Sequence, residues 1–192
     1  MDILTAFGLS ASAGLNAYIP LLVVALLGRF TNLITLNPPW DTLESWWVIG
    51  VLVVLSFIEF FTDKIPAINH ANDIIQTAIR PIAGAIIFAA SAQIITDVHP
   101  VLAMVMGLLV AGSVHAVKTL AVRPVVTATT GGAGNVPVSL AEDIVATILS
   151  ILAAVTPILI AVILVLGGAL IVWWIWRRIN RERVKYNNPE VR

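Results

Sequence analysis

Two polar stretches interrupt an otherwise apolar chain, at residues 59–81 and 115–143. Between them they carry most of the ionisable side chains that stand outside the C-terminal tail. A charged group within or at the edge of a membrane span is energetically costly, so such a group marks a functional site by default. The chemistry open to these side chains is proton-coupled gating, binding of an anion, or coordination of a metal ion.

Glu59 and His115 are the ionisable residues most deeply placed in this pattern. Each stands before its apolar run has clearly ended, with no other charge nearby on the expected helix. We therefore predict that both act as gating or proton-coupled groups. If the helical hairpins that contain them pack side by side, Glu59 should contact His115 or Lys118.

The first polar stretch is expected to open a helix near Asn69, which is a favoured N-cap residue. Side chains at helical intervals share one face of a helix. This face would line a water-filled vestibule, or it would be the polar side of an exposed helix; its residues are His70, Asp73, Thr77 and Arg80. Asp63 and Lys64 precede it, and Asp73 is expected to be matched by Asp143 as a paired acidic position.

The second polar stretch contains a threonine- and glycine-rich loop at residues 127–135. Successive backbone N–H groups in such a loop can turn toward an anion, and a helix beginning at Ser139 would reinforce that field. An anion or phosphate would then be contacted by Lys118, Arg123, Thr129, Thr130 and Asn135.

Each of these charged residues also has a purely structural explanation. Lysine and arginine at span ends commonly snorkel to lipid phosphates. Ser139 and Glu142 have the spacing of a capping box, and Asp143 would sit in the favourable field of a helix N-terminus.

Metal coordination is a further option. Carboxylate and imidazole ligands suit Mg, Mn or Zn, and the candidate ligands are Glu59, Asp63, His70, Asp73, His115 and Asp143. The tight HExxH spacing is absent, as is the G-x-S-x-G nucleophile motif, and the chain has no cysteine. Whether a metal or cofactor is needed stays open, and a non-enzymatic role is favoured.

The composition identifies the class of protein. Of the 192 residues, 59% are hydrophobic and 11% are charged, against about 25% charged residues in ordinary soluble domains. This indicates an integral membrane protein whose first partner is the lipid bilayer. The formal net charge is zero, so no overall field favours nucleic acid as a partner.

The hydropathy pattern predicts an all-α protein with about six transmembrane helices, since a span needs roughly 20 apolar residues. The two polar stretches form hairpin loops that could re-enter the membrane. A transmembrane domain covers residues 1–176, and residues 177–192 form a basic cytoplasmic tail. The expected spans are 3–28, 46–61, 69–95, 101–117, 140–155 and 158–176.

The first predicted span contains small and polar residues followed by Pro20. Proline removes a backbone donor and clashes with the preceding turn, so a kink or break is expected there. One interpretation is a kinked helix with a small-residue packing face. The other is a broken helix whose freed backbone groups, with Asn16, line a cavity.

The placement of lysine and arginine predicts the orientation, because these residues favour the cytoplasmic side. The basic tail puts the C-terminus in the cytoplasm, and six crossings would put the N-terminus there too. Both polar stretches would then lie on the cytoplasmic side.

A short repeated sequence pattern relates the two polar stretches. Residues 71–77 and 141–147 share the pattern A-x-D-I-[IV]-x-T, and each follows a polar loop. This favours a duplicated helical hairpin with both copies in the same orientation, which is a parallel repeat.

Five segments together resemble a family of small bacterial membrane proteins catalogued as domain of unknown function 4126. They are GLNAYIPLL at 14–22, E-x-x-x-DKIP at 59–66, the segment at 73–81, HAVK at 115–118 and TATTGGAGN…SLAED at 127–143. The family pattern has Asn-Pro where this chain reads Asn135-Val136-Pro137. The resemblance implies a compact multi-helix membrane fold and brings no established activity.

These observations lead to one functional hypothesis and two alternatives. We expect a bacterial inner-membrane protein that transports or conducts a small solute, ion or anionic lipid head group. The alternatives are a membrane-embedded enzyme acting on a lipid phosphate, and a structural or assembly subunit. Small-residue faces such as Ala83-Gly84-Ala85 and Gly167-Gly168 would permit a homo-oligomer.

Overall fold

The computed structural model describes residues 3–64, 66–92 and 99–187. The described residues form α-helices and no strand, which confirms the predicted all-α class. A 3-10 turn, η1 (Trp40–Glu44), precedes α3, and a π-helical segment, η2 (Lys118–Val122), joins α5 to α6. The α-helices are α1 (Ile3–Leu15), α2 (Tyr18–Phe30), α3 (Trp46–Thr62), α4 (Pro66–Ala92), α5 (Pro100–Val117), α6 (Arg123–Thr130), α7 (Asn135–Val155) and α8 (Pro157–Asn187).

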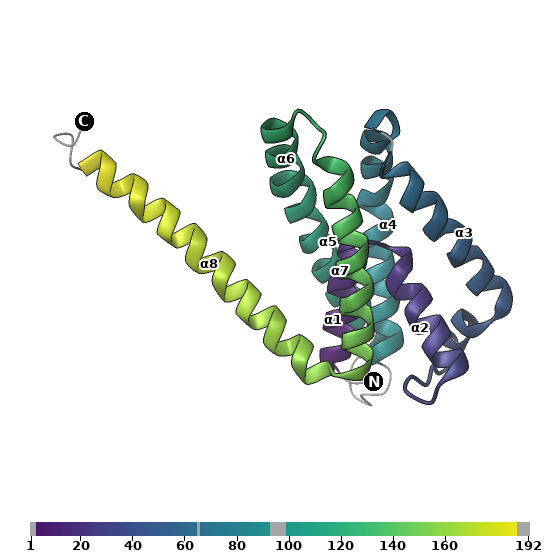
Figure 1. Cartoon of the computed structure of the whole chain (residues 1–192). Helices are drawn as coiled ribbons and strands as arrows, with labels where there is room; N and C mark the ends of the chain where they lie inside the picture. The colour runs from purple at the N-terminus through teal and green to yellow at the C-terminus, as the bar shows by residue number, and fades with distance from the viewer. Residues whose placement is uncertain (1–2, 65, 93–98, 188–192) are drawn as a thin grey trace.

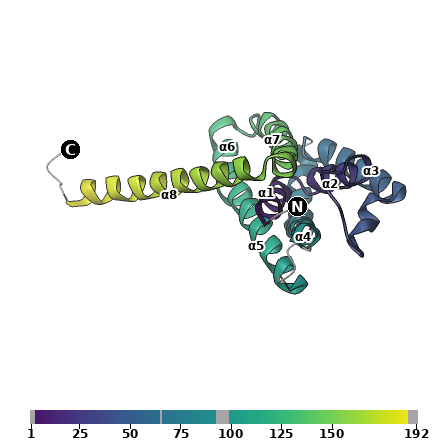
Figure 2. The ribbon, with the colours of Figure 1, turned by 90° about the horizontal axis from the view of Figure 1, so that it is seen from below.

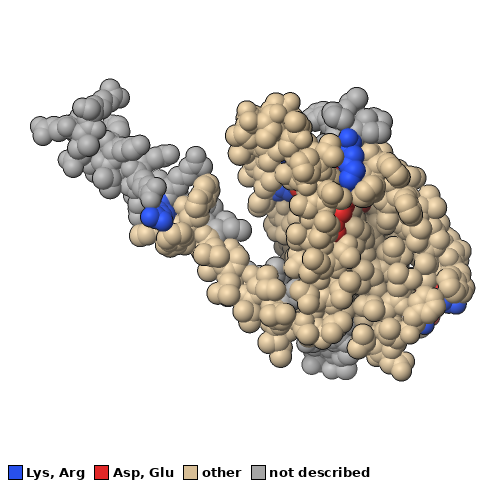
Figure 3. Space-filling view, viewed as in Figure 1, with Lys and Arg blue, Asp and Glu red and all other residues tan. Residues whose placement is uncertain are grey.

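Three stretches of helix in the described part of the chain are long and apolar enough to cross a membrane. They are Ile74–Ser91 within α4, Pro100–Thr130 from α5 to α6, and Asn135–Val155, which is α7. Many large apolar side chains point outward on these and neighbouring helices, among them Leu109 and Phe57. Figure 3 shows a face with few charged side chains. The molecule is therefore an α-helical membrane protein by both length and surface.

The first predicted span is two helices rather than one. α1 and α2 have 13 residues each, or about 20 Å at about 1.5 Å per residue, which is short of a hydrocarbon core of about 30 Å. In Figure 1, α1 rises from the lower end of the bundle and α2 descends again. The single kinked span was the wrong alternative, and the broken helix is what the structure contains.

The break lies at Asn16 and not at Pro20. Asn16 Oδ1 accepts hydrogen bonds from the backbone N–H groups of Tyr18 (3.1 Å) and Ile19 (3.0 Å), which opens α2. Pro20 falls in the first turn of α2, where a missing N–H costs no intrahelical bond. The asparagine side chain, rather than the proline ring, therefore ends one helix and starts the next.

Because α2 brings the chain back to the end at which α1 starts, the two helices together do not cross the bundle. The later helices therefore run in directions other than those predicted from six crossings. Figure 1 shows α1 starting at the lower end, whereas α8 finishes level with α6 at the upper end. Six full crossings predict both ends of the chain on one side, and this arrangement differs from that prediction. The polar connections after α3 and around α6 lie at the upper end.

α1 occupies the centre of the bundle, packed against α4, α5 and α7. Figure 2, seen from below, shows it among these helices. Two serines tie it to its neighbours: Ser10 Oγ donates to the Gly84 carbonyl (3.0 Å), and Ser12 Oγ donates to the Ala146 carbonyl (2.8 Å). Small residues and serine hydroxyls are the usual means by which membrane helices approach closely.

Glycines set the spacing of α1, α4 and α5. A Cβ added at Gly84 would fall on the Ala111 side chain and 2.8 Å from the Gly107 carbonyl oxygen. A Cβ at Gly14 would lie 2.5 Å from the Ala111 carbonyl oxygen. Gly84, on the small-residue face at residues 83–85, thus packs closely against α5 of the same chain.

Both copies of the A-x-D-I-[IV]-x-T pattern lie on helices that run down from the upper end, α4 and α7 (Figure 1). The hairpins α3–α4 and α5–α7 therefore have the same direction. This is the arrangement expected of a parallel repeat, and common ancestry of the two hairpins stays a prediction.

Candidate functional site

A cluster of charged side chains is buried where the α1–α2 turn meets α3, α4, η2 and α7. Their side-chain exposed fractions range from 0% to 18%. Four acids and four bases of the described residues are paired in it: Glu59, Asp63, Glu142 and Asp143 with Lys64, Arg80, Lys118 and Arg123. We call these eight residues the charged cluster.

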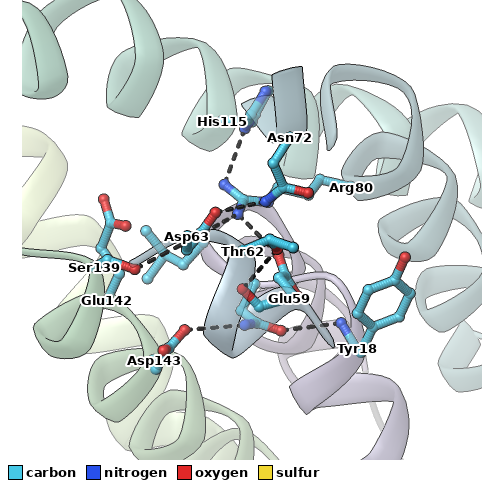
Figure 4. Close-up of polar contacts among 12 residues, drawn as sticks. Tyr18, Glu59, Thr62, Asp63, Asn72, Arg80, His115, Ser139, Glu142 and Asp143 are labelled. Carbon is cyan, nitrogen blue, oxygen red and sulfur yellow. Dashed lines mark hydrogen bonds and ion pairs between the residues drawn. The ribbon is translucent and has the colours of Figure 1, made fainter. Parts of the chain in front are cut away.

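Arg80 lies at the centre of the cluster and is fully buried. Its Nη2 donates to Glu59 Oε1 (2.9 Å) and lies 3.7 Å from Asp63 Oδ2. Its Nη1 lies 3.2 Å from His115 Nδ1 (Figure 4). The predicted direct contact of Glu59 with His115 is thus replaced by a guanidinium that stands between them.

The arginine also decides the hydrogen-bonding roles of His115. A guanidinium can only donate, so Nδ1 of His115 must accept, and the imidazole is neutral with its proton on Nε2. Nε2 in turn lies 3.2 Å from Thr77 Oγ1, which can accept that proton's hydrogen bond. His115 is therefore held in one tautomer by two residues of α4.

Asp63 gathers donors from three other elements. Asn72 Nδ2 donates to its Oδ1 (2.6 Å), and Ser139 Oγ donates to its Oδ2 (3.3 Å). Arg123 Nη2 lies 3.5 Å from the same Oδ2. Hydrogen bonds of this kind are what make a buried carboxylate tolerable.

Lys64 and Asp143 form a second pair across the bundle, with Nζ 3.1 Å from Oδ2. Asn16 Nδ2 donates to the other carboxylate oxygen of Asp143 (3.0 Å). Lys64 also donates to the Phe60 carbonyl (3.0 Å) and stands 3.3 Å from the centroid of the Phe60 ring. Asp143 thereby joins the α3–α4 connection to the break between α1 and α2.

Lys118 completes the cluster at the end of α1. Its Nζ lies 2.7 Å from Glu142 Oε2 and donates to the Leu15 carbonyl (3.2 Å). The last carbonyls of a helix have no intrahelical partner, and a cation there is favoured by the helix dipole. Lys118 thus provides a donor for a carbonyl at the end of α1 and a charge partner for Glu142 of α7.

The π-helical segment explains how Lys118 and Arg123 reach one cluster. Residues five apart lie on different sides of an α-helix with about 3.6 residues per turn. A π turn closes i→i+5 bonds and brings such residues toward one side. Pro124 has no N–H to continue the α-helical ladder, which favours the irregularity at this place.

Nine of the predicted site residues meet at this place, whereas Thr129, Thr130 and Asn135 do not. Thr129 and Thr130 are exposed at the tip of α6, and Asn135 lies at the start of α7. Thr130 Oγ1 donates to the Val126 carbonyl (2.7 Å) and Asn135 Nδ2 donates to Thr127 Oγ1 (3.0 Å). The nine that meet are Asn16, Glu59, Asp63, Lys64, Arg80, His115, Lys118, Arg123 and Asp143.

The predicted anion site of Lys118, Arg123 and the threonine loop is therefore not assembled in this structure. Both cations are buried against acids, whereas the loop hydroxyls bond to their own helix. The side chains of His70 and Asp73 lie outside the described residues, so the matching of Asp73 with Asp143 stays a prediction.

Four residues of the site were missed or misassigned. The capping box at Ser139 is wrong, because α7 already begins at Asn135, and Glu142 instead pairs with Lys118. Asn72 and Gln76 were overlooked. Asn72 and Gln76 lie about two turns and one turn before Arg80 on the same helix. The helix face that carries Arg80 therefore indicated them in the sequence.

Two cavities lined by described residues flank α3. One, of about 250 Å³, lies toward α4 and is lined by Tyr18, Glu59 and Gln76 among others. The other, of about 230 Å³, lies toward α7 and is lined by Asn16 and Asp143 among others. Among the described residues, no three His, Asp or Glu side chains are grouped so that they could hold a metal ion.

The fold and the site together define an α-helical membrane protein with a buried, charge-balanced polar centre. The chain belongs to the family described as a domain of unknown function, DUF4126, whose model matches residues 3–178. The resemblance seen in the sequence motifs is thereby confirmed. Neither a curated protein nor a solved structure matches the chain.

Proposed function

We propose that this protein moves a small solute or ion across a bacterial inner membrane, with the charged cluster as its gate. The observation that supports this is the burial of eight paired charges between helices of an apolar bundle. Buried ion pairs contribute little net stability compared with apolar packing. Their presence within membrane helices is better explained by a role in function.

The pairs join different elements, which suits a gate that opens and closes. Glu59 on α3 is tied to Arg80 on α4, and Lys64 after α3 is tied to Asp143 on α7. Moving the C-terminal end of α3 would break both pairs at once. The two cavities beside α3 leave space for that motion.

The balance of charges restricts how a charged solute could enter. Each cation of the cluster already lies beside an acid, so the closed cluster offers no unmatched charge to an ion. An anionic head group that reached Lys118 would have to displace Glu142, which lies 2.7 Å away. We propose that a solute couples its binding to opening by taking the place of one partner in a pair of the cluster, with Glu59 and His115 as the gating groups.

We further propose that the end of the bundle carrying α6 faces the cytoplasm. This end holds Lys64 and the connection from α5 to α7, while the basic tail follows α8. Lysine and arginine favour the cytoplasmic side of a membrane. With α1 and α2 as a returning pair, the start of α1 then faces the opposite side.

The proposal is tested by flux into liposomes that contain the purified protein. Methylammonium, phosphate and sodium are compared as solutes, for the unaltered chain, for Glu59→Gln and for Glu44→Gln. Glu44 lies at the other end of the molecule, between α2 and α3, and its substitution removes the same charge. We expect flux of at least one solute, changed by Glu59→Gln and unchanged by Glu44→Gln.

One result would overturn the transport proposal, namely equal flux in protein-containing and empty liposomes for every solute. Release of phosphate from a lipid phosphate by the same liposomes would favour the enzymatic alternative, and absence of both activities would favour a structural subunit.

A further inference from the structure

Two buried acceptor oxygens that lack a donor among the described residues belong to side chains that line the cavity between α3 and α4. They are Glu59 Oε2 and Gln76 Oε1. Glu59 is 1% exposed and Gln76 is 2% exposed, and both residues line the cavity of about 250 Å³. A buried carboxylate or amide oxygen without a donor is strongly disfavoured, so an occupant that donates is expected beside them.

The donors of Asn72 and Thr62 in the wall of this cavity, and those of Arg80 that face Glu59, already have acceptors within the protein. Asn72 Nδ2 donates to Asp63 Oδ1 (2.6 Å). Thr62 Oγ1 is bonded to the Ile58 carbonyl (2.9 Å) and to the Glu59 carbonyl (3.1 Å). Arg80 is directed to the other oxygen of Glu59. The Tyr18 hydroxyl, which can donate or accept, is hydrogen-bonded to the Gln76 side chain, whose amide nitrogen is a donor. The wall therefore still offers the two acceptor oxygens, Glu59 Oε2 and Gln76 Oε1.

The rest of the cavity is apolar and lies at the outer surface of the bundle. Ile58 on α3 and Ile75 on α4 line it, and they are 53% and 57% exposed. In a membrane that outer surface meets lipid. An occupant would thus place a polar head against Glu59 and Gln76, and an apolar stem between the two isoleucines.

We propose that this cavity binds a small molecule whose head carries at least two N–H donors and whose stem is apolar. Short primary alkylammonium ions and short primary amides share this chemistry. The alkylammonium would add a positive charge beside the Glu59 carboxylate, whereas the amide would leave the balance of charges unchanged. The chemistry of this site defines a substrate class for the transporter. The inference therefore rests on the proposed function.

Binding is measured by calorimetry on the full chain in lipid nanodiscs. Three probes of matched length are compared: butylammonium chloride, butyramide and sodium butyrate. Butyrate has the same stem but a head that only accepts. We expect butylammonium or butyramide to bind and butyrate not to bind, and whichever donor binds identifies the preferred charge.

Two variants locate the site, with Glu44→Gln as the control. Gln76→Met keeps the length of the side chain and removes its acceptor, and Glu59→Gln replaces one charged acceptor. Each should weaken binding of the donor probe by about tenfold, as expected for one hydrogen bond lost in the site. Comparison of the three probes on the unaltered chain does not depend on either variant folding.

Any one of three results would contradict the proposed site. Butyrate could bind as tightly as the donor probes, no probe could bind, or a folded Gln76→Met variant could bind the donor probe with unchanged affinity. Binding without flux would refute transport and keep the site. Flux of another solute, with no binding here, would refute the site and keep transport.

Discussion

Arg80 Nη2 lies 2.9 Å from Glu59 Oε1, and the two side chains are 0% and 1% exposed. This pair ties α3, which packs mainly against α2 and is flanked by two cavities, to the centre of the bundle. Arg80 also reaches Asp63 and His115. Its removal would leave acids of α3 buried without their central cation.

Arg80→Met should destabilise the fold by about 3–5 kcal/mol, because truncating one partner leaves an uncompensated buried charge. The measurement is reversible unfolding in mixed detergent micelles, followed by circular dichroism. The double variant Arg80→Met/Glu59→Gln should recover part of the loss. Arg29→Met is the control, since Arg29 is exposed. Equal losses in the two arginine variants would contradict a central role for Arg80.

Asn16→Asp should be more damaging than its size suggests. An aspartate can still accept the N–H groups of Tyr18 and Ile19, but it cannot donate to Asp143 as Asn16 does at 3.0 Å. It would place a second carboxylate beside the first, and like charges at such a distance repel. Asn37→Asp, in the exposed loop before α3, is the matched control. A thermal midpoint for Asn16→Asp no lower than that of the control would be inconsistent with this contact.

Gly84→Ala and Gly50→Ala should shift stability in opposite directions. A methyl group at Gly84 overlaps Ala111 and Gly107, so it should cost about 1–3 kcal/mol through overpacking. A methyl group at Gly50 meets nothing within 4 Å, and replacing a helical glycine should gain roughly 0.5–1 kcal/mol. Unfolding midpoints in detergent measure both. The same sign for the two variants would argue against close contact of α4 and α5.

Because α1 starts and α2 ends at the same end of the bundle, we predict on which side of the membrane three positions can be labelled. The chain has no cysteine, so single cysteines can be labelled with a membrane-impermeant maleimide without background. Ile3→Cys and Asn32→Cys should react from the same side of the membrane, and Thr130→Cys should react from the other. Labelling of Ile3→Cys together with Thr130→Cys would mean that residues 3–28 cross the membrane fully.

Much of the site could be predicted because its residue types are out of place in an apolar chain. Glu59, Arg80 and His115 are conspicuous by charge alone. Their partners could not be predicted, since the pairing depends on which helix faces which. The guanidinium of Arg80 occupies the gap in which a direct contact of Glu59 with His115 had been expected.

Two differences between the predictions and the structure have local physical causes. Pro20 is a strong signal for a break, yet Asn16 makes the break by accepting two backbone N–H groups. The threonine loop has the composition of an anion site, but its hydroxyls prefer carbonyls one turn earlier in their own helix, as Thr129 and Thr130 show. Composition cannot distinguish a hydroxyl that faces a ligand from one that bonds to its own backbone.

The central position of α1 has a consequence for how the protein is made. Ser12 is among the first residues to leave the ribosome, but its partners on α7, the Ala146 carbonyl and Ser150 Oγ, lie more than a hundred residues later in the chain. Domains at the N-terminus are usually the first to fold during synthesis. Here the earliest helix has to wait for the late ones, so Ser12 and Asn16 need temporary partners until α7 has been synthesised. The innermost helix of the finished bundle is therefore the last to be enclosed.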